Sequence, residues 1–402
     1  MSVFPAVELT FGPFRLDVPG CRLLRDGADV RLRPRAIHAL LVLVRNRGRF
    51  VGYDQMIAEA WEGTFVSFHT VDVTVAEIKK SLGEYGHWIT RRPKAGYCFE
   101  IPGADELIRK GWHLWNFRTR EGGERAIACF EQAAEEAPDD YRAFEGLSAC
   151  YLMLATFGIN PPSSMYPAFL EAHERAAALG GMRPELRCNR ALGLHMFERR
   201  IDESEQEFLQ TLREKPLYAQ ALVRLAMLYG AHQRFDEALA LIERGYEADP
   251  LFNTLAATEV LIRVWQRDYD NAIAVGRKTI ELHPYLQIAR CNYADALSLG
   301  GRDEDALGQY QRAWLTSPDV PWLRALQAAC MARIGQSDEA GMIARELERV
   351  RRFDYVDAYQ MALLHIALGD RAAAQEELAR AREENSAALY AFDVDPRMDP
   401  LR

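Results

Sequence analysis

Four prolines stand 34 residues apart in this chain of 402 residues: Pro216, Pro250, Pro284 and Pro318. Because proline supplies about 5% of the residues of ordinary proteins, three such coincidences arise by chance roughly once in 10,000 trials. Three further series keep the same period. One consists of Ala238, Ala272, Ala306, Ala340 and Ala374, and a second of Ala226, Ala294, Ala328 and Ala362, with Val260 in the place between the first two. The third consists of Gly301, Gly335 and Gly369, preceded at the same spacing by Gln233 and Arg267. A period of this length restricts most of the chain to an array of similar units.

Each unit is expected to be a pair of antiparallel helices. A turn containing glycine joins the two helices, the alanines let them approach closely, and the proline ends the second helix. A helix–turn–helix period of 34 residues with alanine at the crossings resembles the tetratricopeptide repeat. The first unit begins at Asp105, and the second has a longer loop from Gly158 to Ser164. We predict an all-α solenoid of about eight helical hairpins over residues 103–402, the last ones degenerate.

The composition changes near residues 101–105, where PGAD forms the expected linker. Before the linker, short strand-like runs are mixed with helices, whereas Ala, Leu, Glu and Arg dominate after it. Residues 1–102 contain 14 Lys and Arg against 11 Asp and Glu, a charge of +3, and the remainder contains 35 against 47, a charge of −12. We therefore expect two parts with different partners, residues 1–102 and residues 103–402.

The composition disfavours several classes of protein. The longest purely apolar run, from Ala39 to Val44, is far shorter than the roughly 20 residues of a membrane helix, and the first residues lack the features of a signal peptide. Seven cysteines are scattered singly, which favours reduced thiols in a cytoplasmic protein over disulfides or a metal site. The chain has no glycine-rich phosphate loop and no pattern that places two carboxylates in a cleft. We expect neither an enzyme nor a cofactor.

The first hundred residues predict a small α+β domain. Residues 11–33 alternate apolar and polar side chains and contain turns at residues 19–20 and 26–27, which predicts a small antiparallel sheet. A first helix is expected to begin at Pro34 and to end before Gly48, and a second to cover about residues 53–61. The segment WITRRPKAGYCFEI predicts a closing hairpin with its basic residues at the tip.

The third expected helix, HTVDVTVAEIKKSLG, has two different faces. Its apolar stripe advances by steps of four, three and four residues, through Val71, Val75, Ile78 and Leu82. At about 100° per residue the opposite face holds His69, Val73, Ala76, Glu77 and Lys80. We expect one face of this helix to lie in a core and the other to be free to enter a groove.

The motifs FGPFRLD, LRPRA, GRFV, TVDVTVAEIKKSLG and PKAGYCF follow in this order over about residues 8–101. Their order resembles the OmpR/PhoB-type winged helix-turn-helix of bacterial response regulators. The segment RKGWHLWNFRTREGGERAIACFEQAAEEAP and the tail AFDVDPRMDPLR resemble the repeat regions of HilA-like and CadC-like regulators, here without a membrane helix. The resemblance implies a DNA-binding domain with its third helix in the major groove and its hairpin beside a minor groove or phosphates.

The resemblance also implies the contacting residues. The implied DNA contacts are His69, Thr70, Val73, Thr74, Glu77 and Lys80 from the helix and Arg91, Arg92 and Lys94 from the hairpin. It implies further that the loop from Glu62 to Phe68 could touch RNA polymerase. Where related helices commonly carry two adjacent arginines this chain has Ala76 and Glu77, and a glutamate repels phosphates or accepts a hydrogen bond from a base such as cytosine. We expect repulsion.

These observations predict a sequence-specific DNA-binding transcription regulator. Its acidic array is expected to bind a protein, a peptide or a small effector, or to associate with a second copy, because repeat arrays form extended binding surfaces. The alternative is an adaptor built from the repeats, whose winged helix is a protein-docking module without DNA binding. Ala76 and Glu77, in place of two adjacent arginines, motivate that alternative.

Overall fold

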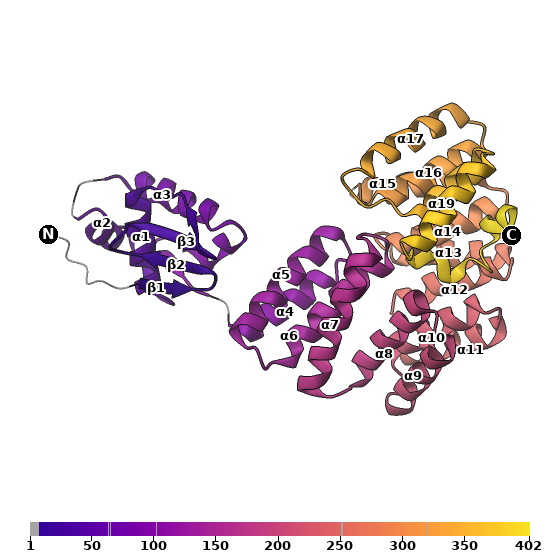
Figure 1. Ribbon diagram of the computed structural model, residues 1–402, viewed down its shortest axis with the longest axis horizontal. Helices are drawn as coiled ribbons and strands as arrows, with labels where there is room; N and C mark the ends of the chain where they lie inside the picture. Colours follow the sequence, from indigo (N-terminus) through magenta and orange to yellow (C-terminus); the bar gives the residue numbers. More distant parts are fainter. Residues whose placement is uncertain (1–7, 63, 65, 102, 251, 319) are drawn as a thin grey trace. The chain divides into compact units, whose positions relative to one another are not determined.

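The computed structural model describes residues 8–62, 64, 66–101, 103–250, 252–318 and 320–402. Within them the chain divides into two compact units, of which the first ends at Leu107 and the second takes nearly all of the chain from Ile108 to Arg402. Figure 1 shows short strands and helices in the first unit and stacked helices in the second.

The first unit holds two small antiparallel sheets and three helices. One sheet has the strand order β1-β2-β3-β4 and the other the order β5-β7-β6. The bounds are β1 Glu8–Phe11, β2 Phe14–Asp17, β3 Arg22–Arg25, β4 Ala28–Val30, α1 Pro34–Arg45, β5 Phe50–Val51, α2 Tyr53–Ala60, α3 Phe68–Ser81, the 3-10 helix η1 Gly83–Trp88, β6 Ile89–Arg92 and β7 Gly96–Phe99. The expected sheet, three helices and hairpin are all present, and the strand β1, the short strand β5 and the 3-10 helix η1 are additions.

Local sequence explains where these elements begin and turn. Asp26 and Gly27 both have positive φ, 52° and 83°, which is the turn geometry that matches the twist of a two-residue hairpin between β3 and β4. Pro34 lies in the first turn of α1, where its fixed φ suits a helix and its missing N–H costs no hydrogen bond. Ser67 caps α3 by accepting a hydrogen bond from the Thr70 amide at 3.2 Å.

The apolar stripe of α3 lies in the core of the first unit. Val71, Val75 and Ile78 are at most 1% exposed, and they belong to the same buried cluster as Trp88. The Trp88 ring packs edge-on against the Phe99 ring of β7, with 6.1 Å between the ring centroids. One face of α3 is therefore fixed by the core, and the opposite face points away from it.

From Ala104 onward, the described residues form sixteen α-helices in eight consecutive pairs. Their bounds are α4 Ala104–Trp115, α5 Arg120–Glu136, α6 Tyr141–Thr156, α7 Pro162–Gly180, α8 Pro184–Gly193, α9 Ile201–Glu214, α10 Ala219–Ala231, α11 Phe235–Ala248, α12 Thr254–Trp265, α13 Tyr269–Leu282, α14 Gln287–Leu299, α15 Asp303–Thr316, α16 Pro321–Arg333, α17 Ser337–Val350, α18 Ala358–Ala367 and α19 Arg371–Glu383. The π-helical turn η2 Leu194–Glu198 follows α8, and the 3-10 turns η3 Ala387–Ala391 and η4 Pro396–Leu401 follow α19.

The repeat period has a backbone cause. The turn inside every pair holds one residue with φ between 55° and 90°, and these residues are Arg118, Gly158, Arg199, Gln233, Arg267, Gly301, Gly335 and Gly369. The left-handed region costs glycine little, whereas a residue with a Cβ is strained there. The turn geometry thus persists at Gln233 and Arg267, where the sequence does not supply glycine.

The alanine and proline ladders lie where the period predicts them. The alanines are 0% exposed at the helix crossings, and they are Ala226, Ala238, Ala272, Ala294, Ala306, Ala328, Ala340, Ala362 and Ala374. Pro216, Pro250, Pro284 and Pro318 each stand two residues after the end of a second helix, namely α9, α11, α13 and α15. The last two pairs keep both the left-handed residue and the buried alanine, although the sequence predicted degenerate final units.

The first helix of a pair is more deeply buried than the second. Ten of the 13 residues of α10 are buried, against four of the 14 residues of α11. In the next pair but one, eight of 13 residues of α14 are buried, against three of 14 of α15. The first helices therefore form an inner layer, and the second helices form an outer one.

Early and late pairs of the array also touch. The indole of Trp322, at the start of α16, donates a hydrogen bond to the Phe157 carbonyl after α6 at 2.9 Å. Arg120, at the start of α5, donates to the Ile159 carbonyl at 3.0 Å and to the Asp354 carboxylate after α17 at 2.9 Å. The array thus bends until its second pair meets its seventh. No helix among the described residues has the length and apolar character needed to cross a membrane.

Candidate nucleic-acid interface

Helix α3 presents one stripe of exposed side chains. His69, Val73, Ala76 and Lys80 follow one another by four, three and four residues and are all exposed, Val73 at 46%. We call these four residues the reading face. Thr70, at the first turn of α3, is half-buried beside it. A methyl-bearing side chain, a short one and a cation on one stripe suit close approach to base edges and phosphates.

Thr74 does not belong to the reading face. It is 5% exposed, and its hydroxyl donates a hydrogen bond to the Thr70 carbonyl at 2.8 Å within α3. One helical step of about 100° from Val73 turns this side chain toward the core. The expectation of a DNA contact by Thr74 is corrected, because the side chain is not accessible to a ligand.

Glu77 is held by an arginine from another helix. Arg33, the N-cap residue of α1, donates from Nε to Glu77 Oε2 at 2.8 Å, and a second guanidinium nitrogen binds the same oxygen. The hydrogen bonds from the Arg33 side chain outweigh the opposing effect of burial and lower the pKa of the Glu77 carboxyl. The expectation of a free repelling carboxylate is corrected, since Arg33 neutralises it.

Asp72 connects α3 to two other elements. Its Oδ1 accepts hydrogen bonds from the hydroxyls of Tyr53 on α2, at 2.6 Å, and of Tyr97 on β7, at 2.7 Å. Its Oδ2 lies 3.5 Å from an Arg91 guanidinium nitrogen. Burial acts to raise the pKa of Asp72, but the two hydroxyls and the Arg91 charge outweigh it and lower that pKa. The carboxylate fixes α3 against the hairpin.

The hairpin of β6 and β7, which we call the wing, carries exposed cations. Arg92 and Lys94 are exposed, and the Arg92 guanidinium lies over the Phe50 ring, 5.4 Å from its centroid. Gly96 has φ +97°, and a Cβ at this position would lie 2.0 Å from the Val51 carbonyl oxygen. Only glycine therefore fits at the start of β7, where the backbone passes close to β5.

Sequence patterns did not reveal the partners that orient these side chains. Arg33 lies 44 residues before Glu77, and no periodicity links the two. Tyr53 and Tyr97 reach Asp72 from elements that are distant in sequence. Such pairings arise from tertiary packing, so they become visible only when the helices are placed.

The loop from Glu62 to Phe68 is only partly described, because residues 63 and 65 lie outside the described residues. At its end Phe68 is 55% exposed and packs against the Tyr53 ring with 4.8 Å between centroids. Its expected contact with RNA polymerase remains a prediction.

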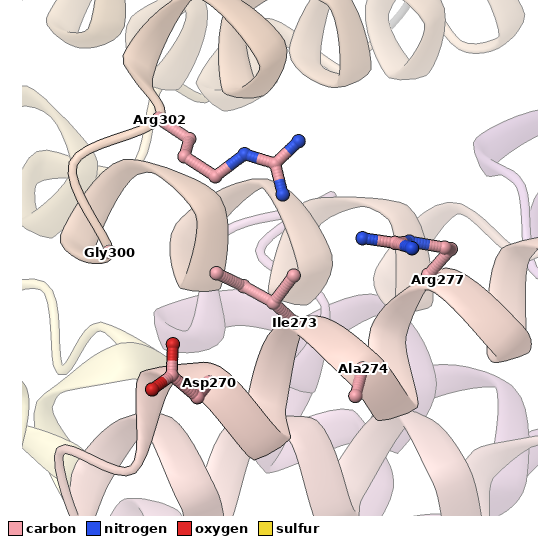
Figure 2. A pocket seen from close by; sticks show the side chains of 6 residues that line it. All are labelled: Asp270, Ile273, Ala274, Arg277, Gly300 and Arg302. Atoms are coloured by element: carbon pink, nitrogen blue, oxygen red, sulfur yellow. The ribbon is translucent and has the colours of Figure 1, made fainter.

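The array has a shallow hollow on its outer side. It has a volume of about 410 Å³ and is lined by Asp270, Ile273, Ala274, Arg277, Gly300 and Arg302. Figure 2 shows the two guanidinium groups on one side of Ile273 and the Asp270 carboxylate on the other. Arg302 already binds Asp305, with 2.9 Å from Nε to Oδ2. We assign no ligand to this hollow, and within the described residues no cluster of His, Cys, Asp or Glu is arranged to hold a metal.

Comparison with known proteins gives a match for each unit. Residues 27–99 match the family described as "Transcriptional regulatory protein, C terminal", and residues 194–251 match the one described as "Tetratricopeptide repeat". The transcriptional regulatory protein KdpE of Mycobacterium tuberculosis is 33% identical over 91 residues, which are 22% of this chain and 40% of KdpE. The transcriptional activator CadC of Escherichia coli is 28% identical over 85 residues, 20% of this chain and 17% of CadC. The chain thus spans less than half of either relative.

A solved structure is similar over most of the chain. The human IFIT1 dimer with m7Gppp-AAAA has a TM-score of 0.54 at 14% identity, over 87% of this chain and 90% of that one. At this identity the likeness concerns the fold alone.

Proposed function

We propose that this chain, which joins an OmpR/PhoB-type winged helix to tetratricopeptide repeats, is a transcription regulator that binds duplex DNA sequence-specifically. One observation carries the proposal: α3 exposes the reading face beside a basic wing, while both of its carboxylates, Asp72 and Glu77, are engaged by the fold itself. An exposed helix face without free negative charge suits the major groove, and basic hairpin residues suit phosphates or a minor groove.

The proposal gives each exposed side chain a role. Val73 and His69 contact base edges, where an apolar group such as Val73 recognises a thymine methyl. Lys80 and Thr70 bind phosphates at either end of α3. The wing residues Arg91, Arg92 and Lys94 act on phosphates or on the potential of a minor groove.

The array serves interaction in this proposal. Its acidic surface repels a polyanion and suits a protein or peptide partner, or a second copy. The loop from Glu62 to Phe68 is proposed to contact RNA polymerase. Because its target is chromosomal DNA, the chain acts in the cytoplasm of a bacterial cell. Regulation by binding of this kind requires no catalytic step.

A salt series tests DNA binding. The full-length chain is titrated against a fluorescent duplex at several salt concentrations, and the slope of log affinity against log salt is measured. Lys94→Ala should weaken binding to every duplex similarly and flatten this slope by about 1, since one phosphate contact is lost. The matched control is Arg125→Ala, which removes the same charge from the exposed Arg125–Glu121 pair of α5. A slope that changes equally in both variants would count against the wing assignment.

The docking-module alternative makes a different prediction for the same titration. A winged helix that binds only protein shows no binding to duplex DNA, even at low salt. Arg33 weakens the case for this alternative, because the Glu77 charge that motivated it is neutralised.

A further inference from the structure

The end of the chain turns back into the array. The segment from Ser386 to Arg402, which we call the tail, follows α19 and forms η3 and η4. Its Ala387, Ala391 and Val394 belong to one buried cluster with Leu152 of α6 and Trp265 of α12. The tail, yellow in Figure 1, thus lies against first helices of several pairs, which form the inner layer.

The inner layer holds a tail tyrosine between two aromatic side chains. The Tyr390 ring meets the His195 ring edge-on at 5.2 Å and the Trp265 ring at 5.9 Å between centroids. His195 is 1% exposed, and neither of its ring nitrogens has a hydrogen-bond partner among the described residues. It lies in the π-helical turn η2, a distortion that is frequent at functional sites.

A second pocket holds a tail arginine. The Arg397 guanidinium lies 2.6 Å from Asp295 Oδ1 of α14 and 2.8 Å from Asp395 Oδ2 of the tail. The hydroxyl of Tyr359, on α18, donates to Asp395 at 3.0 Å, and the hydroxyl of Tyr310 binds Asp295. Burial raises the pKa of Asp295, and the Arg397 charge opposes this effect.

The contacts of the tail are of the kinds found where a protein binds a peptide. A buried ion pair adds little net stability compared with apolar side chains of the same volume, because desolvation offsets the attraction. A tail that served only to cover the inner layer would therefore need no arginine. Tyrosine, tryptophan and arginine are the residues that most often dominate binding energy at interfaces. The tail joins α19 through a turn at Asn385, where φ is 55°, so the tail and α19 are separate elements.

We propose that the inner layer of the array is a peptide-binding site, that the tail is its resident ligand, and that a partner peptide with an aromatic side chain and an arginine placed like Tyr390 and Arg397 displaces it. This proposal deepens the interaction role proposed for the array and rests on it, and it does not require DNA binding. It gives the array a closed state, with the tail bound, and an open state, with the partner bound.

A peptide-uptake experiment without DNA tests the proposal. A fluorescent synthetic peptide of residues 384–402 is titrated with the full-length chain, and binding is followed by anisotropy. Arg397→Ala in the chain weakens the resident tail, so this variant should bind the unaltered peptide at least about tenfold more tightly than the unaltered chain does. The same substitution in the peptide should weaken its binding to that variant by a similar factor.

Arg402→Ala is the matched control. The described contacts of Arg402 are with tail atoms, such as the Asp395 carbonyl at 2.8 Å, so this variant should take up peptide like the unaltered chain. Circular dichroism checks that each variant keeps its helices. Equal uptake by the Arg397→Ala and Arg402→Ala chains would overturn the proposal.

A second variant that weakens the tail keeps the proposal testable if the first variant does not fold. If Arg397→Ala loses helix content, Tyr390→Ala empties the aromatic pocket instead, and the same gain in peptide uptake is expected. No uptake by a folded Tyr390→Ala chain would show that the tail is a permanent part of the core. If the unaltered chain does not bind duplex DNA while the tail variants take up peptide as expected, the function proposed for the winged helix fails and this proposal stands.

Discussion

Asp72→Ala should loosen α3 without removing a single core side chain. The Asp72 Oδ1 accepts the hydroxyls of Tyr53 and Tyr97 at 2.6 and 2.7 Å, so the substitution leaves both donors without their acceptor. A hydrogen bond to a charged group is worth about 1.5–3 kcal/mol when it is buried. The Asp72 side chain is 32% exposed, so we discount each bond to about 1 kcal/mol and expect a loss of about 2 kcal/mol.

Hydrogen exchange in the full-length chain measures this loss directly. The amides of α3 report the free energy of local opening, and 2 kcal/mol corresponds to exchange that is faster by roughly 30-fold. Asp72→Asn keeps an acceptor oxygen and should lose less. Glu100→Ala, at the exposed residue that follows β7, removes the same charge and is the control.

The outcome distinguishes a positioning role from a general charge effect. If α3 exchanges at the same rate in Asp72→Ala and Glu100→Ala, the carboxylate does not hold the helix and the reasoning fails. If only Asp72→Ala exchanges faster, affinity for duplex DNA should fall in that variant as well, because α3 and the wing are no longer held in one geometry.

Three further predictions concern the array. Gln233→Gly should stabilise it by about 0.5–1 kcal/mol, because Gln233 has φ 61°, and relief of left-handed strain exceeds the entropy cost of glycine; an unchanged denaturation midpoint would refute the strain. Ala272→Leu should cost about 1–3 kcal/mol by overpacking a 0% exposed site, whereas Ala274→Leu, on the exposed side of the same helix, should cost far less in the same unfolding assay. Burial lowers the pKa of His173 to about 4 and of His195 to about 3. Since the unfolded chain then binds protons more readily, stability should fall as the pH drops below about 6.5, by up to about 1.4 kcal/mol per unit for each histidine, and His195→Phe should show a shallower pH dependence of its melting temperature.

The periodic spacing of residues in the sequence predicted most of the fold. The 34-residue ladders gave the positions of the helix crossings and of the turns between pairs, because those positions repeat the same steric demand in every unit. The apolar stripe of Val71, Val75 and Ile78 likewise gave the buried face of α3, since helical spacing decides which side chains share a face. The resemblance to OmpR/PhoB-type winged helices with tetratricopeptide repeats is confirmed by the matches at residues 27–99 and 194–251.

Long-range polar partners were outside the reach of the sequence. Glu77 was expected to repel DNA, and only the placement of α1 against α3 reveals Arg33 beside it. Thr74 was named as a DNA contact from the resemblance alone, although it lies one helical step from Val73 toward the core and is 5% exposed. The inward path of the tail was equally hidden, because Tyr390 and Arg397 have no periodic relation to the helices that receive them.

The central claim is that the reading face of α3 enters the major groove. Guanine N7 lies on the major-groove edge of its base pair, so its methylation by dimethyl sulfate reports whether that groove is occupied. On a guanine-containing duplex selected by the full-length chain from random sequences, the account predicts protection of N7 inside the bound site, lost in Val73→Asp and kept in Glu100→Ala. Unprotected N7 throughout a site that hydroxyl-radical cleavage shows to be bound, or protection that survives Val73→Asp, would contradict it.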